Sequence, residues 1–113
     1  MHLRSTYRLE NDENEHVFGP GRFRILELIR ELGSMNKAAQ QLGMSYRGLW
    51  SRIKLTEERL GFSLVMTESG RGSQLTPEGE ELLKKYSDLR DRCQAADDAV
   101  YQEIFGDHPF PGV

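Results

Sequence analysis

Cysteine and histidine, on which metal and redox chemistry in proteins often depends, are scarce in this sequence. There is one cysteine, Cys93, and the three histidines, His2, His16 and His108, are too far apart to indicate a zinc site. The sequence also lacks a cluster of acid, base and nucleophile, and it has no phosphate-binding loop. We therefore expect no metal, no cofactor, no internal disulfide and no enzymatic activity.

Long apolar runs are missing as well. No stretch approaches the roughly 20 apolar residues that cross a membrane, and the N-terminus has no secretory signal. Eleven glycines and four prolines among 113 residues are too few to predict a disordered chain. The sequence therefore predicts one soluble, cytoplasmic domain with a small core and no membrane partner.

Acidic residues are absent from one segment of the chain. The formal net charge is -3, which by itself argues against nucleic acid as a partner. Residues 34–56, however, contain four bases and no acid, whereas residues 77–105 contain eight acids and four bases. A chain with its charges separated in this way can present a cationic surface to phosphates while its other end stays anionic.

The spacing of apolar residues changes near the start of the chain. A weak alternation on both sides of a polar turn at 11–14 predicts a β-hairpin within residues 1–19. From Arg22 the apolar residues follow a helical spacing as far as Gly33, and glycine is typical just beyond the end of a helix. A hairpin followed by a helix is therefore expected.

Two closely spaced helix caps follow. Ser34 is placed to cap a short helix that ends at Gly43, and Ser45 is placed to cap a second helix that ends at Gly61. The connection over 42–45 is tight and contains glycine, which adopts a left-handed conformation without strain. This arrangement is typical of a helix-turn-helix.

A second hairpin and a long helix complete the chain. Alternating residues around a turn with two glycines predict a short hairpin over 62–75. Thr76 and Pro77 form a strong helix start, because threonine caps helices and proline fits the first helical position. No glycine or proline occurs over 80–105, so the helix is expected to be about 40 Å long.

The helix after Ser45 carries the side chains expected to contact DNA. Leu49, Ile53 and Leu60 share one side and are expected to pack on the preceding helices. In helix-turn-helix proteins the first turn of such a helix enters the major groove. Arg47 is the best candidate for reading guanine, because its planar guanidinium can donate two parallel hydrogen bonds to O6 and N7. The predicted DNA-binding residues are Ser34, Lys37, Ser45, Tyr46, Arg47, Ser51, Lys54 and Arg71.

Three of these interpretations have a plainer alternative. The basic residues of the helix would also suit a solvated surface. Trp50 lies between the packing side and the outward side, and we favour packing in the core over contact with a sugar or a thymine methyl group. Arg71 suits a wing that reaches phosphates or the minor groove, and it equally suits an incidental surface loop.

The last helix carries an apolar seam. Its apolar and small residues recur at spacings of four, three, four, three and four, which is the heptad pattern of a coiled coil. A small domain has little surface with which to cover so long a stripe, so we predict antiparallel or crossed pairing of two copies. Cys93 is interpreted as a small seam residue rather than a reactive thiol. The predicted dimer interface consists of Leu82, Tyr86, Leu89, Cys93, Ala96 and Val100.

These elements together predict a fold that is mostly α with small β, a winged helix-turn-helix. The segments are an N-terminal β-hairpin (1–19), a winged helix-turn-helix DNA-binding region (20–76), a long dimerisation helix (77–105) and a tail (106–113).

From Ser34 to Leu83 the sequence resembles the DNA-binding domain shared by LysR-type regulators and the molybdate-responsive ModE regulators. The matching residues include Asn36-Lys37-Ala38-Ala39, Leu42-Gly43-Met44-Ser45, Ile53-Lys54, Glu57, Leu60-Gly61, Leu64-Val65 and Leu75-Thr76-Pro77-Glu78-Gly79. The ModE side is favoured by Phe18-Gly19-Pro20-Gly21-Arg22, by Gly33-Ser34, and by Gly43-Met44-Ser45-Tyr46-Arg47 with Trp50. The resemblance implies a winged helix that dimerises through its last helix and turns Tyr46, Arg47 and Lys54 toward DNA.

ModE-type regulators continue into molybdate-binding domains, and LysR-type regulators continue into an effector domain. This sequence stops at Val113, so we expect a stand-alone DNA-binding domain whose effector is unknown. The sequence thus predicts a homodimeric transcriptional regulator that binds specific sites on double-stranded DNA, with molybdate-related target genes implied by the resemblance. The alternative is a winged-helix adapter that binds protein instead of DNA, which the overall acidic charge would suit.

Overall fold

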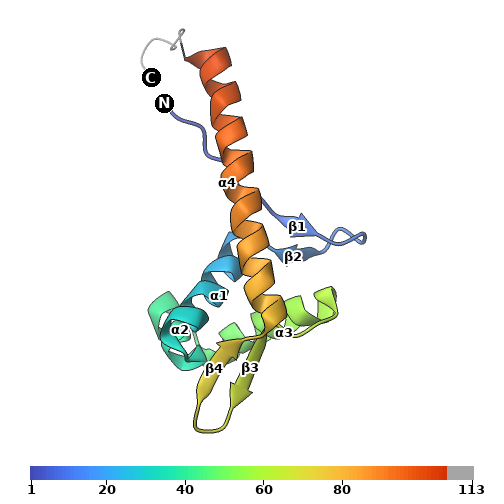
Figure 1. Ribbon diagram of the computed structural model, residues 1–113, viewed down its shortest axis with the longest axis vertical. Coiled ribbons are helices and arrows are strands. Elements are labelled where there is room, and N and C mark those ends of the chain that lie inside the picture. Colours follow the sequence, from blue (N-terminus) through green and yellow to red (C-terminus); the bar gives the residue numbers. More distant parts are fainter. Residues whose placement is uncertain (107–113) are drawn as a thin grey trace.

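A computed structural model describes residues 1–106, so His108 and all but the first residue of the predicted tail lie outside the described residues. In chain order the elements are β1 (Leu9–Glu10), β2 (His16–Phe18), α1 (Pro20–Leu32), α2 (Met35–Leu42), α3 (Tyr46–Leu60), β3 (Val65–Glu68), β4 (Gly72–Leu75) and α4 (Pro77–Phe105). Figure 1 shows that α1, α2, α3 and the β3–β4 hairpin form one body, from which α4 projects upward. The fold is mostly α with small β, as predicted.

Helix α1 lies at the centre of the core. It begins at Pro20, two residues before the predicted start, because proline lacks the N–H that a first helical position leaves unpaired. It ends where Gly33 adopts φ +66° and donates its backbone N–H to the Ile29 carbonyl. Its buried residues are Phe23, Ile25, Leu26, Leu28 and Ile29.

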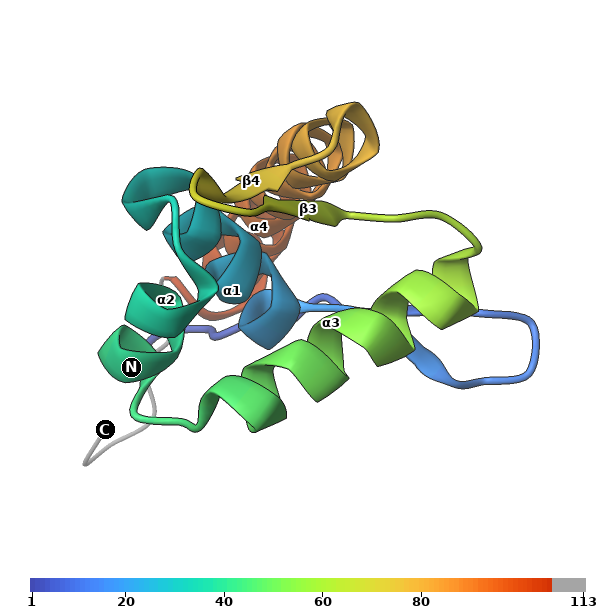
Figure 2. The same cartoon turned by 90° about the horizontal axis from the view of Figure 1, so that it is seen from below.

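Helices α2 and α3 form the predicted helix-turn-helix. The buried methyl groups of Ala38 and Ala39 let α2 pack closely against its neighbours, and Leu49 and Ile53 bring α3 into the same core. Figure 2 shows α3 lying across the lower end of the molecule, with α2 at its N-terminal end and α1 between α3 and the β3–β4 hairpin.

The β3–β4 hairpin is antiparallel, with Val65 opposite Leu75 and Glu68 opposite Gly72. It is fastened to the end of α1 by a hydrogen bond from Ser73 N to the Gly33 carbonyl oxygen at 3.0 Å. The first strand begins at Val65 and not at residue 62. The backbone N–H groups of residues 64 and 65 donate hydrogen bonds to the side chain of Glu57 in α3.

Helix α4 begins at the base of the hairpin, as predicted. The Thr76 hydroxyl caps it by accepting a hydrogen bond from Gly79 N at 3.0 Å. Thr76 N also donates to the Leu64 carbonyl at 2.9 Å, so the first turn of α4 is fastened to the segment before β3. Within residues 1–106 no helix combines the length and apolar content that a membrane crossing requires.

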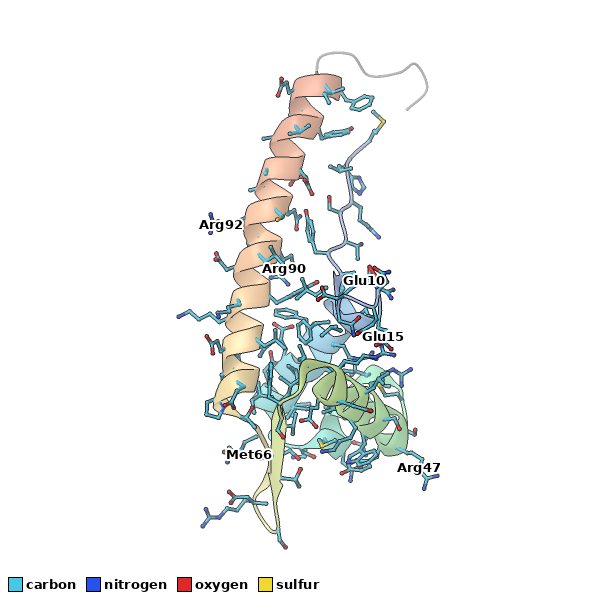
Figure 3. All side chains as sticks on the ribbon, turned by 90° about the vertical axis from the view of Figure 1, so that its right-hand side faces the viewer. Glu10, Glu15, Arg47, Met66, Arg90 and Arg92 are labelled. Atoms are coloured by element: carbon cyan, nitrogen blue, oxygen red, sulfur yellow. The ribbon has the colours of Figure 1, made fainter. Side chains whose placement is uncertain are left out.

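The N-terminal hairpin is shorter than predicted. Its paired residues are Leu9–Glu10 and His16–Phe18, around a turn that contains Asn14 at φ +63°. Residues 1–8 form no strand. Figures 1 and 3 show them running beside the projecting part of α4.

Candidate nucleic-acid interface

Two serine caps and a glycine fix the turn between α2 and α3. Ser34 Oγ accepts a hydrogen bond from Lys37 N at 3.1 Å, and Ser45 Oγ accepts one from Gly48 N at 3.0 Å. Gly43 ends α2 in the left-handed region at φ +67°. Because a hydroxyl oxygen carries a hydrogen as well as lone pairs, both serines can cap their helices and still donate to a phosphate.

Helix α3 has a buried side and an exposed side. Leu49 and Ile53 face the core, and the roughly opposite side lies in solvent. Figure 3 shows Arg47 pointing away from the body at the lower end of the molecule. The structure therefore places several of the predicted residues on one outward surface, and Lys37 of α2 is exposed as well. The exposed predicted residues of this segment are Ser45, Tyr46, Arg47, Ser51 and Lys54.

Trp50 also belongs to this surface, so its predicted place in the core is wrong. The side chain is 44% exposed. Trp50 directly follows the buried Leu49, and consecutive helical residues point about 100° apart, which turns the indole away from the core. The Lys54 ammonium lies over the indole, 5.7 Å from the ring centroid. We call the surface formed by Tyr46, Arg47, Trp50, Ser51 and Lys54 the recognition face.

A buried carboxylate, for which the sequence predicts no role beyond a match to the family pattern, connects α3 to the hairpin. Glu57 Oε2 accepts hydrogen bonds from Leu64 N at 2.6 Å and from Val65 N at 3.2 Å, and Glu57 Oε1 lies 3.2 Å from the Lys54 ammonium. The available signal was an acid on an apolar stripe, since Glu57 follows the buried Ile53 by four residues. This carboxylate fixes the hairpin relative to the recognition face. The Lys54 side chain remains 49% exposed and accessible to a phosphate.

The C-terminal half of α3 is fastened to the N-terminal hairpin and to α1. The Arg59 guanidinium donates to the His16 carbonyl at 2.8 Å and lies 3.2 Å from the Glu15 carboxylate. Arg22 Nε donates to Thr56 Oγ1 at 3.1 Å. These contacts hold α3 from the side opposite its exposed face.

The hairpin tip carries the last predicted residue, Arg71. Its side chain is 77% exposed and lies 3.6 Å from the Glu68 carboxylate. An ion pair this exposed to solvent contributes little to the stability of the fold. Figure 3 shows the hairpin, marked by Met66, at the same end of the molecule as Arg47, whereas Arg92 lies far away on α4. The predicted cationic residues thus lie at the lower end of the molecule, and α4 leads away from this end beyond its first turns.

Only part of the apolar seam of α4 is exposed to solvent. Tyr86 was predicted in the dimer interface, and this prediction is wrong because the side chain is only 2% exposed within the single chain. Its ring lies 5.1 Å from that of Phe18 and 5.2 Å from that of Phe23, measured between centroids. Leu82 is half-buried against the same core.

Farther along α4 the seam faces outward. Leu89 is 38% and Val100 52% exposed, Cys93 is half-buried and Ala96 is exposed. A shallow groove here is lined by Leu89, Cys93 and Ala96, with charged margins formed by Lys85, Asp88 and Arg92. These outer residues of the predicted interface are therefore available to a partner.

The N-terminal segment is held against α4 by contacts that no sequence pattern indicated. The Tyr86 hydroxyl donates to the Tyr7 carbonyl at 2.7 Å, and the Tyr7 hydroxyl donates to the Asp97 carboxylate. That hydrogen bond raises the pKa of Tyr7, and burial raises the pKa of Tyr86. The contacts join residues about 80 to 90 positions apart in sequence.

Several solved structures share this fold. The CbnR_DBD–DNA complex matches 74% of this chain and 95% of that chain, with a TM-score of 0.60 and 23% identity. The complex of BenM_DBD with catB site 1 DNA matches 74% and 91%, with a TM-score of 0.56 and 24% identity. ArgP from Mycobacterium tuberculosis is 28% identical, matching 68% of this chain and 30% of that chain with a TM-score of 0.53. The fold is therefore a winged helix-turn-helix, and the β3–β4 hairpin is its wing.

Curated relatives are found among molybdenum-related proteins. The molybdenum transport protein ModE of Herbaspirillum seropedicae is 34% identical over 74 residues, which are 62% of this chain and 28% of that protein. The protein of the same name from Azotobacter vinelandii is 32% identical over 87 residues, 74% of this chain and 32% of that protein. The chain thus spans about a third of the length of these relatives.

A family model matches residues 21–80, from the first turn of α1 to the first turn of α4. This region is more than half of the chain and includes the helix-turn-helix, the wing and the recognition face. By fold and by sequence, the chain belongs to the LysR family of bacterial regulatory helix-turn-helix proteins.

Proposed function

We propose that this chain is a transcriptional regulator that binds specific sites on double-stranded DNA. The observation that carries the proposal is the recognition face, an exposed surface without an acidic residue on the N-terminal two-thirds of α3. Two of the solved structures with this fold, those of CbnR and BenM, are complexes with DNA. Enzymatic activity is no part of the proposal.

The geometry suits insertion of the first turns of α3 into the major groove. Arg47 is free to place its guanidinium against guanine O6 and N7, and Ser51 lies one turn farther along the same side. Ser34, Lys37 and Ser45 surround the N-terminal ends of α2 and α3, where backbone dipoles also favour a phosphate. Arg71 at the wing tip would contact the backbone or the minor groove beside the site.

We further propose that two copies pair through the outward part of α4. This helix is 29 residues long and projects well beyond the body (Figure 1). In a monomer Leu89, Val100 and Ile104 would remain in water, whereas a second copy of the same seam would cover them. A symmetric dimer would offer two recognition helices to an imperfect palindrome.

The target genes are proposed to concern molybdate. Support comes from the ModE relatives and from the resemblance of the α1 entry and of the turn before α3 to ModE sequences. The effector is unknown. Mapping the bound sites in the genome of the source organism would test this part, since binding upstream of genes unrelated to molybdate would contradict it.

A titration with DNA at several salt concentrations tests the central proposal. Duplexes are first enriched from a random-sequence library with the wild-type chain, and binding is then measured between 50 and 200 mM salt. If Lys37, Lys54 and Arg71 of two copies each neutralise one phosphate, the slope of log K against log salt should be about -5, roughly a thousandfold loss over this range. A protein-binding adapter would enrich no duplex and would show no such slope.

A further inference from the structure

Trp50 is a large apolar side chain that the proposed hydrogen-bonding contacts to DNA do not use. It is 44% exposed, although an indole in water is unfavourable and the other outward residues of α3 nearby are polar or charged. Trp50 lies one helical turn from Tyr46 on one side and from Lys54 on the other, and three residues from Arg47. It therefore stands within the recognition face and not at its edge.

The indole is held in place from the core outward. Lys54 lies over the ring at 5.7 Å from its centroid, and the Lys54 ammonium is 3.2 Å from Glu57 Oε1. Glu57 in turn is buried and bonded to the backbone at the start of the wing. A cation over an aromatic face is attractive, so this chain of contacts restricts the orientation of the ring.

The chemistry of the major groove offers one apolar group that such a ring can recognise. Among the base edges in that groove, only thymine presents a methyl group, at C5. Arg47 and Trp50 are separated by about 4.5 Å along the helix axis, on the order of one base-pair step. A side chain at position 50 would therefore lie near the base pair adjacent to the one that Arg47 contacts.

We propose that Trp50 reads thymine, by packing its indole against the 5-methyl group of a base next to the guanine read by Arg47. The inference rests on the proposed DNA binding. A double-stranded DNA partner is favoured over an apolar protein surface because the charged neighbours of the indole are Arg47 and Lys54, and the first exposed acid along α3 is Glu58. Lys54 acts here as a positioning residue.

Replacement of single thymines by deoxyuridine tests the inference, because it removes the methyl group and leaves the base-pairing edge unchanged. In a duplex enriched by the wild-type chain, each thymine is replaced in turn and the Kd is measured. One position in each half-site should raise the Kd about fourfold, the effect expected for one buried methyl group. The other thymines serve as internal controls.

The variant Trp50→Ala should bind the original duplex more weakly and should lose this sensitivity to deoxyuridine at the same position. Trp50→Leu should keep part of it, and Arg47→Ala should keep it fully while losing discrimination at the guanine. Circular dichroism checks that each variant is folded, which is expected because the side chain is exposed.

The possible failures are distinguishable. Failure to enrich any duplex would contradict the proposed function itself. Binding by the wild type with indifference to every deoxyuridine, or equal sensitivity in the wild type and in Trp50→Ala, would overturn the thymine inference alone. Loss of affinity in Trp50→Ala without loss of the methyl effect would assign the indole to a sugar or phosphate contact, and would overturn it as well.

Discussion

The carboxylate of Glu57 accepts a hydrogen bond from the backbone N–H of Leu64 at 2.6 Å, across the end of α3. The same oxygen accepts from Val65 N, so two N–H groups at the start of the wing are satisfied by a side chain of the recognition helix. The wing and the recognition face therefore cannot shift independently without leaving buried donors unpaired. If both contact DNA as proposed, a DNA site has to fit the wing and the recognition face at a fixed spacing.

Replacement Glu57→Ala should lower the free energy of unfolding by about 2–3 kcal/mol, because hydrogen bonds to a charged group are lost and their donors stay buried. Glu57→Gln keeps a carbonyl acceptor and should lose about half as much. The matched control is Glu58→Ala, next in sequence but exposed, which should change stability by less than about 0.5 kcal/mol. Urea unfolding measures all three. Equal effects of the two alanine variants would show that the Glu57 contacts contribute nothing.

Gly72 and Gly70 offer a second matched pair. Both have positive φ, +73° and +79°, so alanine is strained at either site by about 1 kcal/mol. A Cβ at Gly72 would in addition overlap the Gly33 carbonyl oxygen, to which Ser73 N is bonded, whereas a Cβ at Gly70 meets nothing. Gly72→Ala should therefore lower the unfolding free energy by about 1–3 kcal/mol more than Gly70→Ala. Equal losses in thermal melting would mean that the wing moves freely away from α1.

The helices were predictable because their ends are encoded locally. Ser34, Ser45 and Thr76 cap the helices that they were predicted to cap, and Gly43 and Gly61 end helices in the left-handed conformation. A cap depends on residues within one turn, so the sequence alone contains the information. The same holds for the short wing, whose glycines allow the turn.

The errors arose where distant residues decide the outcome. Tyr86 fits a heptad seam by spacing, but it packs against the aromatic rings of Phe18 in β2 and Phe23 in α1 and is buried in the core of the chain. Trp50 was ambiguous by spacing because it borders the apolar stripe. Glu57 matched the family pattern but received no structural role, because its partners, the backbone N–H groups seven and eight residues away, are known only from the fold. Which outward side chains touch DNA stays a prediction.

The pH dependence of stability should report on His16. Burial, helped by the nearby charges of Arg22, Arg8 and Arg59, lowers the pKa of His16 below its ordinary value of 6.5. Near pH 6 the folded state therefore binds fewer protons than the unfolded state, so this contribution to stability is present above about pH 6.5 and is lost as pH falls through the folded pKa.

Stability measured by urea unfolding from pH 7.5 to 5.5 should decline in the wild type and decline less in His16→Gln. The exposed His2 provides the control, since His2→Gln should keep the slope of the wild type. If His16→Gln and the wild type had the same slope, the titration of His16 would not be linked to folding.

The outward seam of α4 can be tested by placing charges in it. Leu89→Asp with Val100→Asp should convert the proposed dimer to a monomer, because each carboxylate would enter an apolar contact. Ala95→Asp with Gln102→Asp adds the same charge to exposed positions on another side of the same helix and should leave the dimer intact. Sedimentation measures both. A wild type that is monomeric, or a seam variant that stays dimeric, would remove α4 from the interface.

Arg47 should contribute more to the affinity for specific DNA than a basic side chain far from the recognition face. Arg47→Ala should weaken binding to the enriched duplex by about 1–3 kcal/mol, on the order of 5- to 150-fold in Kd, and should relax the preference at one guanine. Arg8→Ala removes the same charge from another part of the molecule, where Arg8 lies 3.9 Å from Glu10 in an exposed pair, and Figure 3 shows Glu10 far from Arg47. That control should change the Kd less than about twofold, because screening at physiological salt acts over roughly 8 Å. Both variants should melt like the wild type, since each side chain is exposed. A comparable loss in the two variants would mean that only net charge matters, and an unchanged Kd in Arg47→Ala would assign the reading of guanine to another residue.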